Sequence, residues 1–535
     1  MARRISALIA AVAAIALIGT MAALPASADP NNNTVKKLTK AVTVKGVLHH
    51  LKALQKVADR NGGNRASGQP GYRKSVDYVV DELDDAGYDP QVQEFTFDYF
   101  EEHSELIRVS PEPREFVNET DFLRNTFDSG SPEGTATGPL TPVGLVLDPS
   151  IPTPNNSSGC EAADFAGFPA GGVALLQRGT CGFNVKVLNA QAAGASAVIV
   201  MNEGQAGRTG LLNMVGDATG LTIPAVFTTY EAGENLASTP GATVTVTVDY
   251  VADQRQAWNV LAETRKGRDD NVVMAGAHLD SVQAGAGIND NGSGSAALLE
   301  TAIQMRKVKP RNTVRFAWWG AEESGLLGSE HYVANLTPEE VGDIALYLNF
   351  DMVASPNYMF GIYDGDNSGG TAAPDFIPPG SDAIEDVFEQ FYADRDEPSQ
   401  DSEFSGRSDY GPFIAVDIPA GGLFTGAEVE KTAAEAALYG GVAGAAYDPC
   451  YHAFCDNLRG DGQDEALYDA LREDYRLIGN VNVHALDVNS DAIATSVLTF
   501  ARDTSTVNGV GGKPGKGKGS LKASEVNRMK DALTR

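Results

Sequence analysis

The stretch NVVMAGAHLDSVQAGAGINDNGSGSAALLE, residues 271–300, joins an apolar run, a glycine-rich turn and an apolar segment of helical length. The run that ends at His278 and Asp280 predicts a buried strand, and the segment after the turn predicts a helix. Glycines in the turn allow the backbone to bend sharply enough to bring Asp290 back over the end of the strand. The stretch therefore predicts one strand–turn–helix unit with acids and an imidazole gathered at its turn.

The second half of the chain repeats this alternation of strands and helices. The run NTVRFAWWGAEE ends at Glu322 and Glu323, the run ALYLNFDM contains Asp351 near its end, and residues 485–502 predict a closing helix. Alternating strands and helices indicate an α/β domain with a largely parallel sheet. Because the active crevice of such a sheet lies at the carboxyl ends of its strands, three strands direct possible ligand side chains to one rim.

The first half has a different character. Residues 36–58 and GYRKSVDYVVDELDDAGYD, residues 71–89, predict amphipathic helices, and PQVQEFTFDYF, residues 90–100, predicts a strand. From about residue 130 to 250 short β-like runs rich in Gly, Ala and Val follow, with one helix predicted in KVLNAQAAGA. We interpret this part as a small β-rich domain set inside a larger one.

Charge and the N-terminal segment limit the class of protein. With 41 Lys and Arg against 71 Asp and Glu, the net charge of −30 argues against nucleic acid or an anionic membrane as partner. Residues 1–28 have a basic start, an apolar run and a small-residue exit, which indicate a signal peptide rather than an uncleaved anchor. No later stretch is apolar enough to predict a membrane span. We expect a secreted protein, with no membrane partner, acting as a monomer.

The four cysteines fall into two close pairs. In an exported chain this spacing favours two local disulfides, Cys160–Cys181 and Cys450–Cys455. A four-thiolate zinc site is the alternative, but the spacing fits no common zinc module. The second disulfide would close a small loop, DPCYHAFCDN, and hold His452 rigidly beside Tyr451.

Five residues form two histidine–carboxylate sets that share one aspartate. Taken singly, each acid is more typical of a turn, a helix cap or the surface. Together they provide ligands that suit zinc, and two ions about 3.5–4 Å apart can clamp the attacking and leaving oxygens of a hydrolysis. The residues are His278, Asp290, Glu323, Asp351 and His452.

Several motifs carry a resemblance to a known family. The segments AHLDS, GINDNGSG, WGAEESGLLGS, NFDM and CYHAFCDN resemble those of the co-catalytic two-zinc aminopeptidases of the bacterial leucine-aminopeptidase type. This resemblance spans about 255–505 and 45–95. The segments VALLQRGTCGFNVKVLNAQAAGASAVIVMN and GLTIPAVFTTYEAGENL are similar to the protease-associated domain.

The resemblance implies an α/β fold, with a mostly parallel mixed sheet flanked by helices and a small β-rich protease-associated domain inserted. It divides the chain into a signal peptide at 1–28, the N-terminal part of the peptidase domain at 29–135, the protease-associated domain at 136–250, the peptidase domain with the zinc site at 251–505, and a flexible basic tail at 506–535.

The resemblance also implies how the metal would be held. His278 and Asp351 would hold one zinc, Glu323 and His452 the other, and Asp290 both. The peptide bond after Asp290 is expected to be cis.

Three further residues receive catalytic roles from the resemblance. Glu322 would act as general base, Asp280 would orient the imidazole of His278, and Tyr451 would hydrogen-bond the developing oxyanion.

Substrate contacts follow in the same way. Glu322, Asp351 and the carbonyl of Arg407 would recognise the free α-amine of a peptide or protein N-terminus. Met352 and Phe424 would line an apolar pocket that favours large hydrophobic N-terminal residues. The implied activity is that of a secreted zinc aminopeptidase.

Other interpretations stay open at this stage. The chain could be a glutamate-carboxypeptidase-like or other exopeptidase of the same superfamily, or a single-zinc glutaminyl cyclase. A receptor relative without activity and a protein that binds cell-wall polymers are the non-enzyme alternatives. Calcium is a further candidate ion, because CDNLRGDGQDEALYD, residues 455–469, is rich in acids.

Overall fold

The computed structural model describes residues 31–511, except 125–126, 128–131, 152–155 and 371–376. The predicted signal peptide at 1–28 and residues 512–535 of the tail predicted at 506–535 lie outside the described residues. The chain forms two compact units, one from the residues up to Glu94 and from Trp258 onward, the other from Phe95 to Ala257. We call them the first and the second unit. In the described part of the chain no helix is long and apolar enough to cross a membrane.

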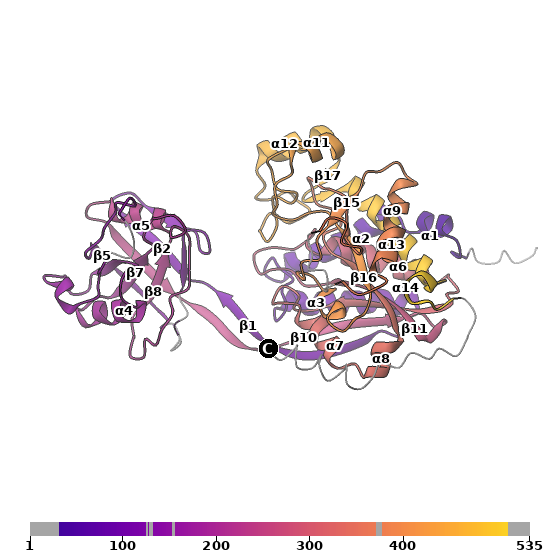
Figure 1. Ribbon diagram of the computed structural model, residues 1–535, viewed down its shortest axis with the longest axis horizontal. Coiled ribbons are helices and arrows are strands. Elements are labelled where there is room, and N and C mark those ends of the chain that lie inside the picture. The colour runs from indigo at the N-terminus through magenta and orange to yellow at the C-terminus, as the bar shows by residue number, and fades with distance from the viewer. Residues whose placement is uncertain (1–30, 125–126, 128–131, 152–155, 371–376, 512–535) are drawn as a thin grey trace, which may run out of the picture. The chain divides into compact units, whose positions relative to one another are not determined.

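A mostly parallel sheet forms the centre of the first unit (Figure 1). The strands β11, β12, β13 and β16 run parallel, whereas β10 and β14 flank them antiparallel. The chain leaves the first unit in β1 and returns in β10. The order across the sheet is β1 (Gln91–Glu102), β10 (Tyr250–Glu263), β12 (Asn312–Trp319), β11 (Arg268–His278), β13 (Ile344–Phe350), β16 (Ala420–Phe424), β14 (Gly361–Tyr363) and β15 (Gln400–Ser402).

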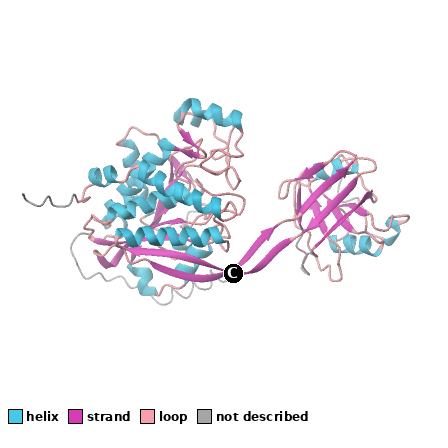
Figure 2. Ribbon diagram, turned by 180° about the vertical axis from the view of Figure 1, so that it is seen from behind, coloured by secondary structure: helices cyan, strands magenta, loops and turns pink. Residues whose placement is uncertain are grey.

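Helices cover both faces of this sheet (Figure 2). Successive residues of a strand point to opposite faces, and the two tryptophans of β12 show this. Trp318 Nε1 donates to the carbonyl of Ser295 in α6 (Gly292–Met305) at 3.1 Å. The Trp319 ring lies 5.2 Å from that of Tyr332 in α7 (Leu327–Ala334) and 5.9 Å from that of Phe413 in α10 (Gly411–Ile414). The predicted α/β fold is confirmed.

The helix α6 lies against β11, β12 and β13 and is itself covered by other helices. Its contacts include α2 (Val44–Arg60), α3 (Pro70–Ala86) and α13 (Val483–Phe500). The remaining elements of the first unit are α1 (Val35–Ala41), α8 (Pro338–Asp343), α9 (Ser381–Ala393), α11 (Ala433–Tyr439), α12 (Glu465–Asp474), α14 (Ser505–Asn508), β17 (Leu477–Ile478) and β18 (Val481–Asn482).

The single helix predicted over residues 36–58 is wrong, because the structure has two helices there. Val42 is extended, with φ −73° and ψ 110°, and it ends α1. Thr43 then caps α2 by accepting the backbone N–H of Gly46 at 3.1 Å. A threonine side chain that satisfies a free N–H of the first turn favours a new helix start over a continuous helix.

The second unit is built on its own sheet. The strands β6 and β7 are buried on both faces. Alternate residues of these strands, such as Ala174 and Val198, pack in one apolar cluster with α4 (Phe183–Ala192), and the others in a second cluster with α5 (Tyr230–Ala237). The strand order is β3 (Arg114–Phe116), β2 (Glu105–Ser110), β9 (Thr243–Val248), β5 (Gly134–Pro142), β6 (Val173–Gln177), β7 (Ala197–Met201), β8 (Ala225–Thr228) and β4 (Phe122–Arg124).

The second unit begins earlier in the chain than the 136–250 range predicted for the inserted domain. It starts at Phe95, because β2 pairs with β9 and β4 pairs with β8. Residues that we expected in the N-terminal part of the peptidase domain thus complete the sheet of the second unit. The structure contains both predicted disulfides, Cys160–Cys181 in this unit and Cys450–Cys455 in the first.

Glycine at position 294 permits the close approach of α6 to the end of β13. A Cβ atom there would overlap the carbonyl oxygen of Phe350 and the side chain of Asn291. We predict that Gly294→Ala destabilises the protein by about 1–3 kcal/mol, the usual effect of overpacking. The matched control is Gly342→Ala in α8, where a Cβ would meet no atom within 4 Å; there we expect an unchanged or slightly higher thermal midpoint. Equal midpoints for both variants in a circular dichroism melt would contradict the packing argument.

Candidate metal centre

The predicted ligands converge at one rim of the central sheet. His278 ends β11, Glu323 follows β12, and Asp351 follows β13. Asp290 lies in the turn before α6, and His452 lies in the loop closed by the Cys450–Cys455 disulfide. All five line one pocket of about 520 Å³.

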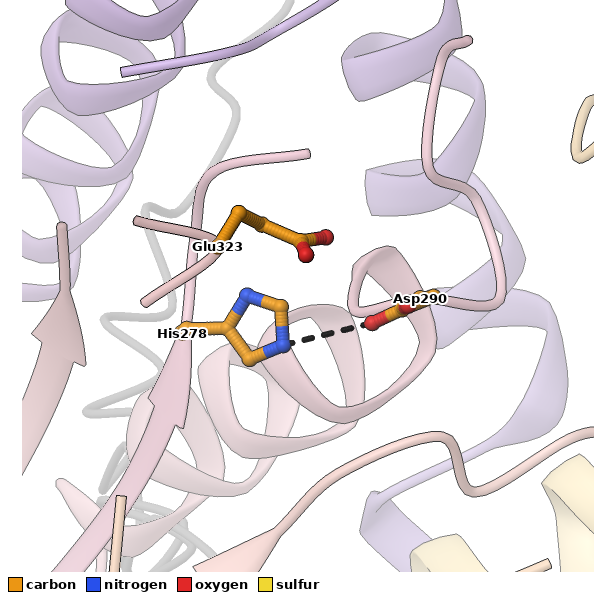
Figure 3. Close-up of side chains that lie close together, drawn as sticks. All are labelled: His278, Asp290 and Glu323. Carbon is orange, nitrogen blue, oxygen red and sulfur yellow. Dashed lines mark ion pairs between the residues drawn. The ribbon is translucent and has the colours of Figure 1, made fainter. Parts of the chain in front are cut away.

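The donor atoms of these residues are closely spaced. His278 Nε2 lies 3.3 Å from Asp290 Oδ1 and 3.2 Å from Asp351 Oδ1. His452 Nε2 lies 3.3 Å from Asp290 Oδ2 and 3.1 Å from Glu323 Oε2. Figure 3 shows the side chains of His278, Asp290 and Glu323 turned toward one another. The two carboxylate oxygens of Asp290 therefore face two different histidines.

Burial and like charges raise the pKa values of Glu322 and Glu323. Burial, reinforced by the charge of Glu323, raises the pKa of Glu322 well above its ordinary value, although His278 opposes this. Burial and the Asp290 charge raise the pKa of Glu323 to about 7. Burial would lower the pKa of His452, but hydrogen bonds to Asp290 and Glu323 raise it to about 10. The crowded acids thus attract positive charge.

The donor set fits zinc. Ligands about 2.0–2.1 Å from a tetrahedral zinc lie roughly 3.3 Å from one another, and the four donor separations given above are 3.1–3.3 Å. Glu323 Oε1 is buried and has no hydrogen-bond partner among the described residues. Imidazole with carboxylate is a ligand combination that zinc prefers.

Three residues with predicted catalytic roles lie next to these donors. Glu322 Oε2 lies 3.9 Å from His278 Nε2, farther than the carboxylates of the ligand set. Asp280 Oδ1 lies 3.6 Å from the other ring nitrogen of His278, Nδ1. The ring of Tyr451 stacks on that of His452 with centroids 3.9 Å apart.

The predicted substrate contacts line the same pocket. The wall of the pocket includes Met352, Phe424 and Arg407, together with Tyr363. The Arg407 side chain forms an ion pair with Glu428 at 2.9 Å, and its Nη2 donates to the hydroxyl of Tyr451 at 3.3 Å.

Several residues at the pocket have left-handed backbone conformations. Such conformations are strained for residues other than glycine, and they cluster at functional sites. The peptide bond between Asp290 and Asn291 is cis, as expected. The left-handed residues are Ala321 (φ 54°), Leu326 (φ 63°), Met352 (φ 49°) and His452 (φ 54°).

Sequence reasoning missed two residues that hold the ligands. The Ser408 hydroxyl donates to Asp351 Oδ2 at 2.6 Å. Asp456 accepts the backbone N–H groups of Asn289 at 2.9 Å and Asp290 at 3.0 Å. Ser408 directly follows Arg407, and Asp456 lies in the segment DPCYHAFCDN, so their position beside predicted site residues was the available signal.

The predicted calcium segment, residues 455–469, forms no acidic metal group within the described residues. Asp461 pairs with Arg459 and Asp464 caps α12. Acids do gather elsewhere, at Asp364, Asp366 and Glu385. Oxygens of Asp364 and Glu385 already accept nearby backbone N–H groups, which explains the cluster without an ion. The binding of calcium stays a prediction.

Comparisons with known proteins agree with this geometry. Residues 259–473 match the model of peptidase family M28, and residues 136–236 match the PA domain. An aminopeptidase of Pseudomonas aeruginosa is 46% identical over 88% of this chain and 83% of its own. Leucine aminopeptidase 2 of Trichophyton tonsurans is 38% identical over 88% of this chain and 86% of its own. A zinc aminopeptidase from Bacillus subtilis has a TM-score of 0.51 at 22% identity, covering 89% of this chain and 97% of that chain.

The fold and the pocket are therefore those of a metallo-aminopeptidase. The chain belongs to peptidase family M28, with a PA domain inserted ahead of the conserved peptidase region. The donor set described above favours zinc as the metal.

Removal of metal is expected to destabilise the first unit. Without a cation, the buried carboxylates of the pocket repel one another, and zinc bound to the native state alone adds about 2.7 kcal/mol at a hundredfold excess over its Kd. We predict that a chelator lowers the thermal midpoint and that added zinc restores it. Unchanged midpoints across the zinc titration would contradict the ligand assignment.

Proposed function

We propose that this protein is an exported, monomeric aminopeptidase that removes N-terminal residues from peptides and proteins with two zinc ions. The observation that carries the proposal is the arrangement of Asp290, whose two oxygens each lie 3.3 Å from a different histidine. A carboxylate in this position suits a bridge between two ions. We assign His278 and Asp351 to one ion and Glu323 and His452 to the other.

The general base in this proposal is Glu322. When bound, zinc supplies Lewis-acid polarisation of the scissile carbonyl and acidifies water. Glu322 accepts a proton from the attacking water and delivers it to the leaving amine. Its raised pKa and its position in the pocket lining, 3.9 Å from His278 Nε2, both suit a group that carries a proton.

Two further residues support the reaction. Tyr451 donates a hydrogen bond to the oxyanion that develops on the substrate carbonyl. Asp280 lies beside Nδ1 of His278 and orients the ring, so that Nε2 points into the pocket.

Recognition of the free α-amine distinguishes an aminopeptidase from an endopeptidase. We assign it to the carboxylates of Glu322 and Asp351 and to the carbonyl of Arg407. Met352, Phe424 and Tyr363 form an apolar wall nearby, which favours large hydrophobic N-terminal residues. The name of the Trichophyton tonsurans relative, leucine aminopeptidase 2, supports this preference.

A carboxypeptidase of the same superfamily is the alternative. It would need cationic side chains for the substrate carboxylate. Among the described residues that line the pocket, Arg407 is the one Lys or Arg, and Glu428 pairs with it. The geometry therefore favours the aminopeptidase.

The proposed activity is tested with leucine p-nitroanilide, with and without chelator and with zinc restored, beside N-acetyl-leucine p-nitroanilide. We expect hydrolysis that requires zinc and that is lost when the amine is acetylated. Equal hydrolysis of the acetylated compound would overturn the assignment of the amine site. Metal analysis of the active enzyme should give two zinc ions per chain.

Replacement of the general base separates catalysis from metal binding. We predict that Glu322→Gln lowers kcat by about 10²–10⁴-fold while the zinc content is unchanged, because the amide keeps the shape but accepts no proton. The matched control is Glu330→Gln, an exposed residue of α7, which should retain full activity. A Glu322→Gln enzyme with normal kcat would assign the base to another residue.

A further inference from the structure

Arg65 is a fully buried cation beside the metal centre. Its exposed fraction is 0%. It lies between α2 and α3 in the segment NRAS, residues 64–67. Its guanidinium donates to three main-chain carbonyls, those of Ala286 at 2.8 Å, Gly287 at 2.6 Å and Leu279. Each of its three nitrogens therefore has a carbonyl partner.

These carbonyls belong to the segment that joins two metal ligands. Leu279 directly follows His278, and Gly287 precedes Asp290 by three residues. The backbone of Arg65 contacts the same segment, because its N–H donates to Ser281 Oγ at 2.9 Å. Arg65 thus fixes the segment near both of its ends.

The neighbours of Arg65 extend this contact to the other ligand-bearing loops. The Asn64 side chain donates to the carbonyl of Gln283 at 3.2 Å. Ser67 Oγ accepts the backbone N–H of Ala321, the residue before Glu322, at 2.7 Å. Residues 64–67 therefore contact the loop after β11 and the loop after β12.

The charge of Arg65 faces acids that it does not pair with directly. Burial lowers the pKa of Arg65 to about 10, and the charges of Asp280, Asp456, Asp290 and Glu323 oppose that decrease. The guanidinium is therefore a cation at neutral pH. A buried charge is stable only where dipoles or opposite charges compensate it. Here three carbonyls accept the hydrogen bonds of the guanidinium, and the negative charges of the nearby carboxylates stabilise its positive charge.

We propose that Arg65 is a positioning residue of the metal centre, which holds the 279–287 segment so that His278 and Asp290 present their donor atoms at zinc-binding distance. This inference rests on the proposed two-zinc site. Arg65 touches neither ligand atoms nor the pocket, so it acts through the backbone. A planar fork can reach three carbonyls at once, whereas the ammonium of lysine is a single point on a flexible stem.

The measurement that isolates this role is zinc affinity, determined by competition with a chromogenic chelator. A residue that only stabilises the fold supports metal-free and metal-bound protein equally, and its loss leaves the affinity unchanged. A positioning residue changes the affinity. Loss of groups that orient ligands typically weakens metal binding by about 10–100-fold, and we expect this range for Arg65→Met. Arg65→Lys, which keeps the charge but not the fork, should fold and show an intermediate loss.

The matched control is Arg108→Met in the second unit. Arg108 is also buried, and it donates to the Glu112 carbonyl at 2.7 Å and to side chains of Asn235 and Thr239 at 2.8 Å. Its loss should lower the thermal midpoint without changing zinc affinity.

Wild-type affinity in Arg65→Lys, or an equal loss in Arg108→Met, would overturn the inference. Should Arg65→Met fail to fold, Arg65→Lys alone decides. A wild-type protein that binds no zinc would instead refute the proposed function, so the two failures are distinguishable.

Discussion

The crowding of carboxylates at the rim of the central sheet is the constraint on which the rest of the site depends. Asp290, Glu322, Glu323 and Asp351 line one pocket with two imidazoles. Burial raises the pKa of Glu322 and Glu323, and the charges of neighbouring carboxylates add to the rise, whereas the histidines oppose it. The fold must therefore hold these groups against their own repulsion. The structure holds these acids together through rigid backbone around them.

Three kinds of restraint provide that rigidity. Parallel strands fix His278 and the acids after β12 and β13, because the strand ends share one edge. A disulfide closes the loop of His452. Hydrogen bonds orient two of the remaining proposed ligands. The Ser408 hydroxyl donates to Asp351, and Asp456 accepts the backbone N–H of Asp290. The disulfide and the hydrogen bonds act on loops, which the strands leave free.

The sequence was sufficient to predict the parallel sheet, the helix after the glycine-rich turn and the disulfides. These features depend on local periodicity, on spacing and on the chemistry of one or two residues. The break at Val42 and Thr43 was not predicted, because the apolar pattern continues across it and only the threonine cap reverses the outcome. The pairing of β2 with β9, which adds residues before 136 to the sheet of the second unit, was not predicted either. It joins residues more than a hundred positions apart in sequence, and no local pattern records such pairing.

The residues of the candidate site also fall into those that the sequence could predict and those that it could not. The convergence of the proposed ligands could be predicted because histidines and acids at strand ends are unusual enough to be seen together. Arg65 could not be recognised as part of the site from its residue type, because an arginine in a turn between helices is usually exposed. Its role depends on three carbonyls that lie more than two hundred residues away in sequence.

Charge balance connects Arg65 with the number of ions. Asp290, Glu322, Glu323 and Asp351 line the pocket together with Glu403. Further carboxylates, those of Asp280, Asp409 and Asp456, are buried beside it, and Arg65 is a buried cation among them. Carboxylates therefore outnumber cationic side chains around the proposed site, and buried negative charge that stays uncompensated is costly in a low-dielectric interior. Binding of two divalent cations reduces this excess more than binding of one, and this reasoning is independent of the distances that support the bridging position of Asp290.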